Sequence, residues 1–427
     1  MHSRDLVRTL ECIYWPIGAL MAIVVWAASG LIAEHWLKTV SMSVEQATGA
    51  LLLLGLATAL QWPVSFYTGG LSGLQRQVLL NVLATGFATA RSGGAVCVLW
   101  LISPTIEAYL WWQVGMSAVQ SVTYAWITWR ALPGGSRAAS FSWPQLRQIG
   151  AFAIGVTSVT ILSFLLTQSD RIILSKLLPL SDFGVYAFAA TIAVMLYKLV
   201  QPIVAAVYPR YSQLVAAGNT DVLVDFYHRT NQLLAALLLP IAAVVAAFAT
   251  DLLRVWTGDV ALAAASGPIL TLLVIGTALN GLLNLPYALQ LAYGWTRLGF
   301  WVNMVSVPCV VPAIWIMGSN FGGKGAAAVW LALNLGYLLV SIPLMHRRLL
   351  TGDMWRWYLA DVGPPFAASA LVVVSWRLAV SSVPDGVLGW LSLLVVLATS
   401  MMVSLAVSSF PRRMVHAWLT TFRGSAK

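Results

Sequence analysis

Apolar and polar residues follow one another along the chain in long blocks. Apolar stretches of roughly 20 residues recur throughout, which is the length an α-helix needs to cross the hydrocarbon core of a bilayer. Strands of a membrane β-barrel are about half as long and alternate polar with apolar residues, so helices are predicted instead. Twelve stretches are predicted as membrane spans: 13–33, 47–67, 78–103, 108–128, 149–168, 183–207, 232–250, 266–288, 298–317, 325–345, 358–379 and 387–409.

Composition agrees with an all-α polytopic membrane protein. Hydrophobic residues make up 59% of the 427 residues and charged residues only 9%, and the mean hydropathy is +0.83. A chain of this length and apolarity exceeds what a soluble core buries. We therefore predict a multi-pass protein of about twelve transmembrane helices.

Basic residues between the predicted spans fall mainly on one side of the membrane. Of the 24 Lys and Arg residues, sixteen lie in the termini and the even-numbered loops, five in the opposite loops and three inside spans. Basic loops stay in the cytoplasm, so both termini are predicted to be cytoplasmic. The net charge of +10 then reflects topology and attraction to the lipid surface, and nucleic-acid binding is not predicted.

The succession of spans is interrupted at residues 131–148, where Arg, Gly, Pro and Ser are mixed. Pro and paired Gly end helices, so this segment is predicted to link two helical bundles. A second boundary, at 346–356, sets the last two spans apart. The predicted domains are a four-span N-terminal lobe at 1–130, a six-span C-terminal lobe at 149–345, and two accessory spans with a basic tail at 346–427.

Four predicted spans carry polar residues on one face, at steps of three and four residues. Lipid tails reject such faces, so they are expected to point at one another or at water. One interpretation is interhelical hydrogen bonding, which is common in bundles. The other, favoured because the pattern occurs on both sides of the linker, is a shared central cavity. The residues are Gln113, Ser117, Gln120 and Tyr124; Thr160, Ser163 and Thr167; Thr191, Lys198 and Gln201; and Thr277, Asn280 and Asn284.

Arg91 is the most informative single charge. It lies near the middle of the predicted span 78–103 and is followed by Ser92-Gly93-Gly94. A charge at membrane depth costs about 2.5–3.5 kcal/mol on insertion scales, so it is normally kept only where it faces a partner or a wet cavity. A role in a cavity is favoured over structural pairing, because snorkelling to either surface is difficult from this position.

Other charges near the spans allow more than one interpretation. Asp170 and Arg171 follow the polar face of the fifth span, where they are either part of a cavity or an exposed pair at the interface. Lys198 is interpreted as either a cavity cation or a side chain that snorkels to the cytoplasmic face. Asp361 and Arg377, at opposite ends of the eleventh span, are predicted to be anchors at the helix ends and not functional groups.

The reactive residues indicate binding and not catalysis. The three cysteines and five histidines show no spacing of a disulfide framework or metal site. No catalytic triad or phosphate-cradling loop is visible, so an enzyme, a cofactor and a metal are not predicted. Guanidinium and ammonium groups in a cavity favour phosphate and carboxylate, and a lone carboxylate such as Asp170 could carry a proton or Na⁺. The predicted cargo is an anionic amphiphile.

Several segments resemble polysaccharide-biosynthesis exporters of the Wzx (O-antigen flippase) type. The run from Asp170 to Leu214 has an Asp after a polar helix, then Gly184-x-Tyr186, and Pro202 followed by Pro209. Further similar segments, whose order and spacing match the family across about the whole chain, are 66–76, 237–259, 284–290 with Gly294, and 322–327. The family is part of the exporter superfamily that includes MATE and MurJ.

The resemblance implies a two-lobe bundle around a cavity, here with a truncated N-lobe, because the two helices that normally open that lobe are not found. It also implies flipping of a polyprenyl-pyrophosphate-linked oligosaccharide across the bacterial inner membrane by alternating access, coupled to a cation. A polysaccharide polymerase or chain-length regulator is a further implied partner. The residues expected to bind the pyrophosphate are Arg91, Arg171 and Lys198, with Asp170 as the ion-coupling group and Gln113, Gln120, Tyr124, Thr167, Asn280 and Asn284 facing the sugars.

Three other functions remain open at this stage. A MATE-like exporter of small molecules would use the same fold, but for cationic cargo it usually needs acidic residues. An integral-membrane polymerase or ligase would normally show a large outward loop, and no loop of that size occurs. The chain could also be a truncated, non-transporting subunit of a polysaccharide assembly complex.

Overall fold

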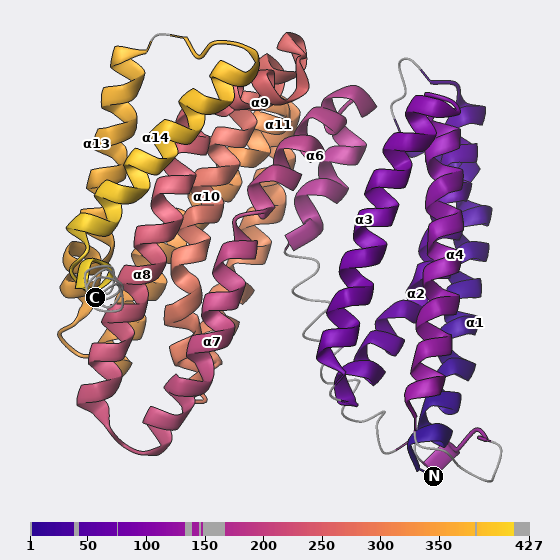
Figure 1. The fold of residues 1–427 in the computed structure, drawn as a ribbon, viewed down its shortest axis with the longest axis horizontal. Coiled ribbons are helices and arrows are strands. Elements are labelled where there is room, and N and C mark those ends of the chain that lie inside the picture. The colour runs from indigo at the N-terminus through magenta and orange to yellow at the C-terminus, as the bar shows by residue number, and fades with distance from the viewer. Residues whose placement is uncertain are drawn as a thin grey trace, which may run out of the picture. The chain divides into compact units, whose positions relative to one another are not determined.

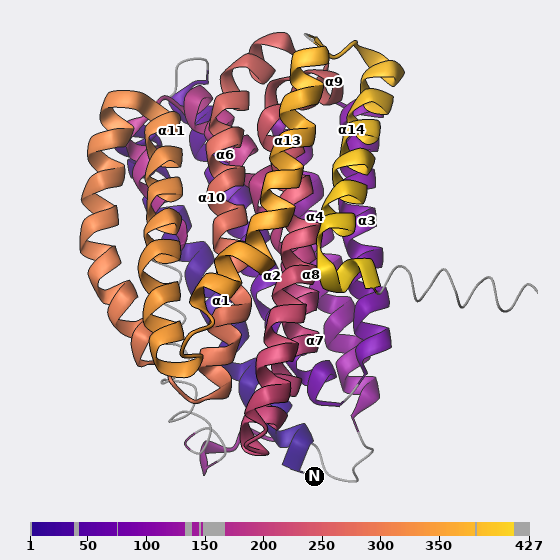
Figure 2. The same cartoon turned by 90° about the vertical axis from the view of Figure 1, so that its left-hand side faces the viewer.

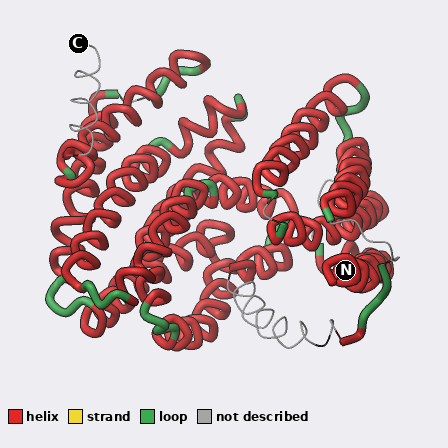
Figure 3. The backbone as a smooth tube through the Cα atoms, turned by 60° about the horizontal axis from the view of Figure 1, so that its bottom comes forward, coloured by secondary structure: helices red, strands yellow, loops and turns green. Residues whose placement is uncertain are grey.

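The computed structural model describes residues 2–37, 42–74, 76–132, 139–144, 147, 167–380 and 382–413. Every regular element in these ranges is a helix, as predicted (Figures 1 and 3). Nine of the described helices are long and apolar enough to cross a membrane. The all-α polytopic fold class is therefore confirmed.

The chain forms two compact units, Met1–Gln168 and Ser169–Lys427. The predicted division into lobes stays a prediction. The helices of unit 1 are α1 (His2–Leu31), the π-helical turn η1 (Ile32–Trp36), α2 (Val44–Gly73), α3 (Gln77–Leu101) and α4 (Ile106–Ala131). Those of unit 2 are α6 (Leu180–Val194), α7 (Tyr197–Ala216), α8 (Thr220–Ala247), α9 (Ala249–Thr257), α10 (Val260–Ala292), α11 (Arg297–Leu349), α12 (Met354–Arg356), η2 (Trp357–Val362), α13 (Gly363–Ala379) and α14 (Gly386–Val407).

In unit 1, α2 packs against both α1 and α4, and α3 packs mainly against α4. Small residues let these helices approach closely, as is usual in membrane bundles. A side chain at Gly18 would meet the backbone of Ala59 across the α1–α2 contact, and one at Gly94 would meet the ring of Trp112 across the α3–α4 contact. The buried side chains of α2 include Tyr67, which lies in the small core of this unit.

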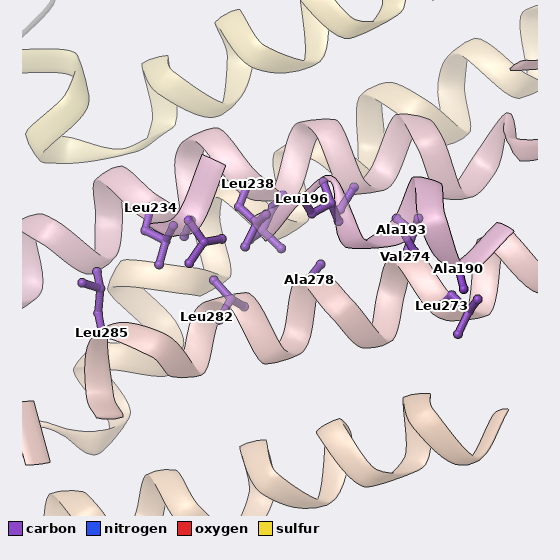
Figure 4. Packing of buried hydrophobic residues seen from close by; sticks show 14 of the residues in the cluster. Ala190, Ala193, Leu196, Leu234, Leu238, Leu273, Val274, Ala278, Leu282 and Leu285 are labelled. Carbon is purple, nitrogen blue, oxygen red and sulfur yellow. The ribbon is translucent and has the colours of Figure 1, made fainter. Parts of the chain in front are cut away.

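In unit 2, α10 is the central helix and contacts α6, α7, α8, α9 and α11. Its buried face carries Leu273, Ala278 and Leu282, which pack with Leu196 and with the α8 residues Leu234 and Leu238 (Figure 4). The α10 sequence is apolar on almost every side, which is the pattern expected of a helix surrounded by others. The accessory helices α13 and α14 pack on α8 and on each other.

Three predicted spans differ in detail from the helices observed. The spans predicted at 298–317 and 325–345 are the two halves of α11, which meet at Gly322, where φ is +60°. Only glycine adopts such a backbone readily. The Tyr337 hydroxyl donates to Asn303 Oδ1 at 3.2 Å, so the halves lie side by side (Figure 2). The span predicted at 183–207 is broken between α6 and α7, and the fifth span, 149–168, lies almost entirely outside the described residues.

Candidate functional site

Arg91 lies on α3 inside a cluster of polar side chains from α2 and α4. Its Nη1 donates to Gln113 Oε1 at 3.0 Å, to Ser117 Oγ at 3.3 Å and to Gln61 Oε1 at 3.5 Å. Its Nη2 donates to Gln120 Oε1 at 2.7 Å. The polar face predicted on the fourth span therefore points at the charge predicted on the third.

Local sequence explains how the guanidinium reaches this position. Residues 113, 117 and 120 recur at steps of four and three, so they share one face of α4. Because Gly94 has no side chain, the ring of Trp112 lies against α3 there. The Trp112 indole Nε1 then donates to the backbone oxygen of Arg91 at 3.0 Å. This contact fixes α3 against α4 at the level of the arginine.

The cluster around Arg91 is electrically neutral apart from the arginine itself. Among the described residues of unit 1, the ion pairs join Arg8 to Glu11 and His35 to Glu34, and none includes Arg91. The guanidinium is only half-buried. Amide and hydroxyl oxygens satisfy its donors without cancelling its charge, so an anionic group could replace some of them and gain a full ionic contact.

Tyr124 lies one turn further along α4. It is 2% exposed and packs in the core of unit 1, with its ring 6.0 Å from that of Phe87. Its hydroxyl hydrogen-bonds with the side chain of Gln120, a partner of Arg91. Its expected place facing the sugars stays a prediction.

Asp170 and Arg171 lie on a helix at 167–177 of unit 2, and both are half-buried. Asp170 Oδ2 accepts a hydrogen bond of 2.5 Å from the hydroxyl of Tyr186 on α6. Tyr186 is itself fully buried. Asp170 is therefore tied to the core of unit 2, which does not fit a simple exposed pair at the interface. Thr167 is exposed at the first described turn of this helix, whereas Thr160 and Ser163 lie outside the described residues.

Lys198 is exposed and lies just after the break between α6 and α7. The continuous apolar segment there runs from Leu180 to Ala216, so Lys198 is at its centre. The two interpretations of Lys198, a cavity cation and a side chain that snorkels to the cytoplasmic face, stay predictions. The break consists of tight turns: Met195 N bonds to Ile192 O at 3.1 Å and Lys198 N to Met195 O at 3.0 Å. Pro202, which has no N–H, removes the donor that the Lys198 carbonyl would use in a regular helix.

Asn280 and Asn284 lie on α10 beside a cavity of about 220 Å³ between α10 and α11. The Asn280 amide is already engaged: its Oδ1 accepts from Tyr197 at 2.7 Å, and its Nδ2 donates to Asn334 at 2.7 Å. Asn284 Nδ2 donates to the Asn280 backbone oxygen at 2.9 Å. The polar face of α10 thus serves interhelical bonding and lines a cavity at the same time.

The structure brings together some of the predicted site residues. Arg91, Gln113 and Gln120 are in direct contact in unit 1, whereas Arg171, Lys198 and the two asparagines lie in unit 2. A common site formed by both units stays a prediction.

Sequence reasoning missed several polar residues that matter in the structure. Gln61, a partner of Arg91, stands alone in an apolar run, and such an isolated amide was the available signal. Asp361 was interpreted as an anchor at a helix end, and this is wrong: it is fully buried and contacts His228. Arg377 is partnered too, since its Nη1 lies 2.7 Å from Asp251 Oδ2.

Two family models match parts of the chain. The family model described as "Polysaccharide biosynthesis protein" matches residues 12–215, and the MatE family model matches residues 156–316. Each match covers less than half of the chain, so the chain is similar to both families over adjoining, partly overlapping segments. The resemblance inferred from the sequence is therefore confirmed at this level.

A solved structure supports the superfamily fold. The chain of "Lipid II flippase MurJ, inward closed conformation" is 13% identical, with a TM-score of 0.66, and the match covers 97% of this chain and 84% of that one. At this identity the likeness concerns the fold. Among curated proteins no significant match was found. The chain therefore shares its fold with the solved structure of a lipid flippase.

Proposed function

We propose that the protein flips a polyprenyl-pyrophosphate-linked oligosaccharide across the bacterial inner membrane by alternating access, with both termini in the cytoplasm. The superfamily and the fold support movement of a lipid-linked saccharide. The observation that carries the proposal is Arg91, a charge in mid-span held only by neutral oxygens among the residues described.

The chemistry of this cluster suits a diphosphate. The Arg91 guanidinium presents a fixed fork of donors that matches two phosphate oxygens. Gln113 and Gln120, released from Arg91 when phosphate binds, have amide groups that can hydrogen-bond sugar hydroxyls. Binding therefore exchanges hydrogen bonds to neutral oxygens for hydrogen bonds that also carry the attraction between opposite charges.

The remaining roles are proposed on the same basis. Arg171 and Lys198 are the cations that unit 2 would offer to the second phosphate or to the same one. Asp170 is the coupling group, because a carboxylate bonded to Tyr186 at 2.5 Å can exchange that bond for a proton or Na⁺. Asn280 and Asn284 are proposed to face the sugars from the α10–α11 cavity.

Reconstitution of the purified chain in liposomes with a fluorescent lipid-linked oligosaccharide tests the proposal. Arg91→Gln should lower the flipping rate at least about tenfold, and Arg91→Lys, which keeps the charge and loses the fork, should lower it less. Thr123→Val on α4 is the matched control, because its hydroxyl bonds only within its own helix. An unchanged rate in Arg91→Gln would remove this residue from the mechanism, and activity of the chain alone would exclude a non-transporting subunit.

A MATE-like exporter of small cationic molecules remains a second candidate because of one observation. Glu11 on α1 is 7% exposed and borders an open groove of about 630 Å³ whose walls include three tryptophans and Arg8, its ion-pair partner at 3.2 Å. The tryptophans are Trp15, Trp126 and Trp129. A buried carboxylate among aromatic rings is a surrounding that suits organic cations. Export of such a cation by the reconstituted chain, abolished in Glu11→Gln and retained in Arg91→Gln, would favour this function over flipping.

A further inference from the structure

A second cluster of cations lies in unit 2, remote in sequence from every residue assigned above. A cavity of about 410 Å³ opens where α8 meets the segment of Arg356 and the helical turn at 409–413 that follows α14. Three arginines line it: Arg229 from α8, Arg356 from α12 and Arg413 from the turn after α14. Three segments far apart in the sequence thus contribute one guanidinium each.

The floor of this cavity is a rigid, buried polar network. His228 Nδ1 lies 2.5 Å from Asp361 Oδ2, and Gln232 Nε2 donates to Asp361 Oδ1 at 2.9 Å. Gln232 Oε1 in turn accepts from Ser409 Oγ at 2.9 Å and from the backbone N–H of Phe410 at 3.0 Å. The network joins α8, η2 and the end of α14, so the positions of the three arginines are set by buried contacts.

The walls of the cavity carry a surplus of positive charge. Arg229 pairs with Asp225 at 2.6 Å, and both side chains are 50% exposed. Arg356 lies 3.8 Å from Asp353, a distance that leaves most of its hydrogen-bonding capacity open. Arg413 is exposed and pairs with none of the described carboxylates. An oxyanion at the centre would meet three guanidinium groups and one lining carboxylate.

The position of the cavity along the membrane normal indicates where its ligand comes from. The loops at 209–231 and 346–356 and the C-terminus are the basic, cytoplasmic ones in the predicted topology. Basic pockets between helices on that side bind the phosphates of anionic lipids. A phosphodiester within the headgroup layer has the charge and the geometry for arginine forks. We propose that this cavity binds the headgroup phosphate of an anionic phospholipid and thereby fastens the accessory helices to α8.

Titration of the purified full-length protein with phosphatidylglycerol tests the proposal, with binding followed by native mass spectrometry. The double variant Arg356→Gln/Arg413→Gln should bind phosphatidylglycerol at least about tenfold more weakly than the wild type. Arg347→Gln/Arg412→Gln is the matched control, because these arginines are exposed on the same side and do not line the cavity. It should bind within about twofold of the wild type.

Other arms of the experiment separate the source and the nature of the ligand. Phosphatidylcholine, with the same phosphate and no net charge, should bind the wild type at least about tenfold more weakly. Arg356→Lys keeps the charge and should stay within about threefold of the wild type, which preserves the test if the double variant does not fold. Equal loss in both double variants, or full binding in Arg356→Gln/Arg413→Gln, would overturn the site. Saturation by inorganic phosphate alone, with no further binding of phosphatidylglycerol, would overturn the lipid assignment.

Discussion

The buried carboxylate of Asp361 should be among the most costly side chains to remove from unit 2. It is fully buried beneath the basic cavity, and it accepts hydrogen bonds from His228 at 2.5 Å and from Gln232 at 2.9 Å. Asp361→Ala leaves His228 Nδ1 and Gln232 Nε2 without their acceptor, whereas His228 Nε2 still lies 3.3 Å from Asp353. A hydrogen bond to a charged group contributes about 1.5–3 kcal/mol, and breaking a buried pair costs about 3–5 kcal/mol. We therefore expect Asp361→Ala to lower the free energy of unfolding by about 3–5 kcal/mol.

The isosteric variant refines this estimate. Asp361→Asn keeps the volume and one acceptor oxygen, so Gln232 retains its bond while the contact with His228 loses its charge. Asp361→Asn should therefore lower the free energy of unfolding by about half as much as Asp361→Ala. Asp225→Ala is the control, because its ion pair with Arg229 is 50% exposed and lies on one helix. Exposed pairs of this kind contribute less than about 1 kcal/mol.

Equilibrium unfolding in mixed micelles with a rising fraction of sodium dodecyl sulfate measures these differences. The twenty tryptophans supply the fluorescence signal, and linear extrapolation gives the free energy of unfolding. If the free energies of unfolding of Asp361→Ala and Asp225→Ala differ by less than about 1 kcal/mol, the network does not hold α8 to η2. The rigid floor described for the basic cavity is then wrong.

Three further predictions concern other contacts. Gly94→Val should lower the free energy of unfolding by about 1–3 kcal/mol, because its branched side chain would meet the ring of Trp112; an unchanged unfolding curve would refute the close α3–α4 contact. Asp251→Asn should weaken the 2.7 Å contact with Arg377 and increase proteolysis of the accessory helices, whereas unaltered cleavage would show that they are held otherwise. Lys198→Met should slow flipping severalfold without changing stability, since the side chain is exposed; a loss of stability would indicate a structural role.

The location of most helices follows from hydropathy, because an apolar stretch of about 20 residues is what a helix needs to cross a bilayer. Their number does not, since twelve spans were predicted and nine are found among the described residues. The residues near Arg91 were also predictable, since a 3.6-residue period aligns Gln113, Ser117 and Gln120 whatever their neighbours do. Their contact with Arg91 followed because a charge in an apolar span needs polar partners.

Other features depended on tertiary structure that no local pattern reports. The break after Val194 tightens the helix, and each residue in such a turn adds about 20° of rotation relative to an α-helix. Thr191 and Lys198, aligned in the sequence, therefore do not keep a common face across it. Asp361 looked like an interfacial anchor because its partner, His228, lies 133 residues away. Tyr124 follows its polar neighbours on α4 at the same helical spacing, yet its side chain packs in the core.

The neutral surroundings of Arg91 have a consequence for energetics in a living cell. Moving one elementary charge across the full membrane potential changes its free energy by about 2.3 kcal/mol per 100 mV. Arg91 lies near the middle of α3. A rearrangement that carried it through half of that field would therefore change in free energy by on the order of 1 kcal/mol per 100 mV. A diphosphate diester carries two negative charges, so the loaded carrier would have a net charge of about −1 at Arg91 where the empty carrier has about +1, and the membrane potential would favour opposite directions of movement in the two halves of the cycle.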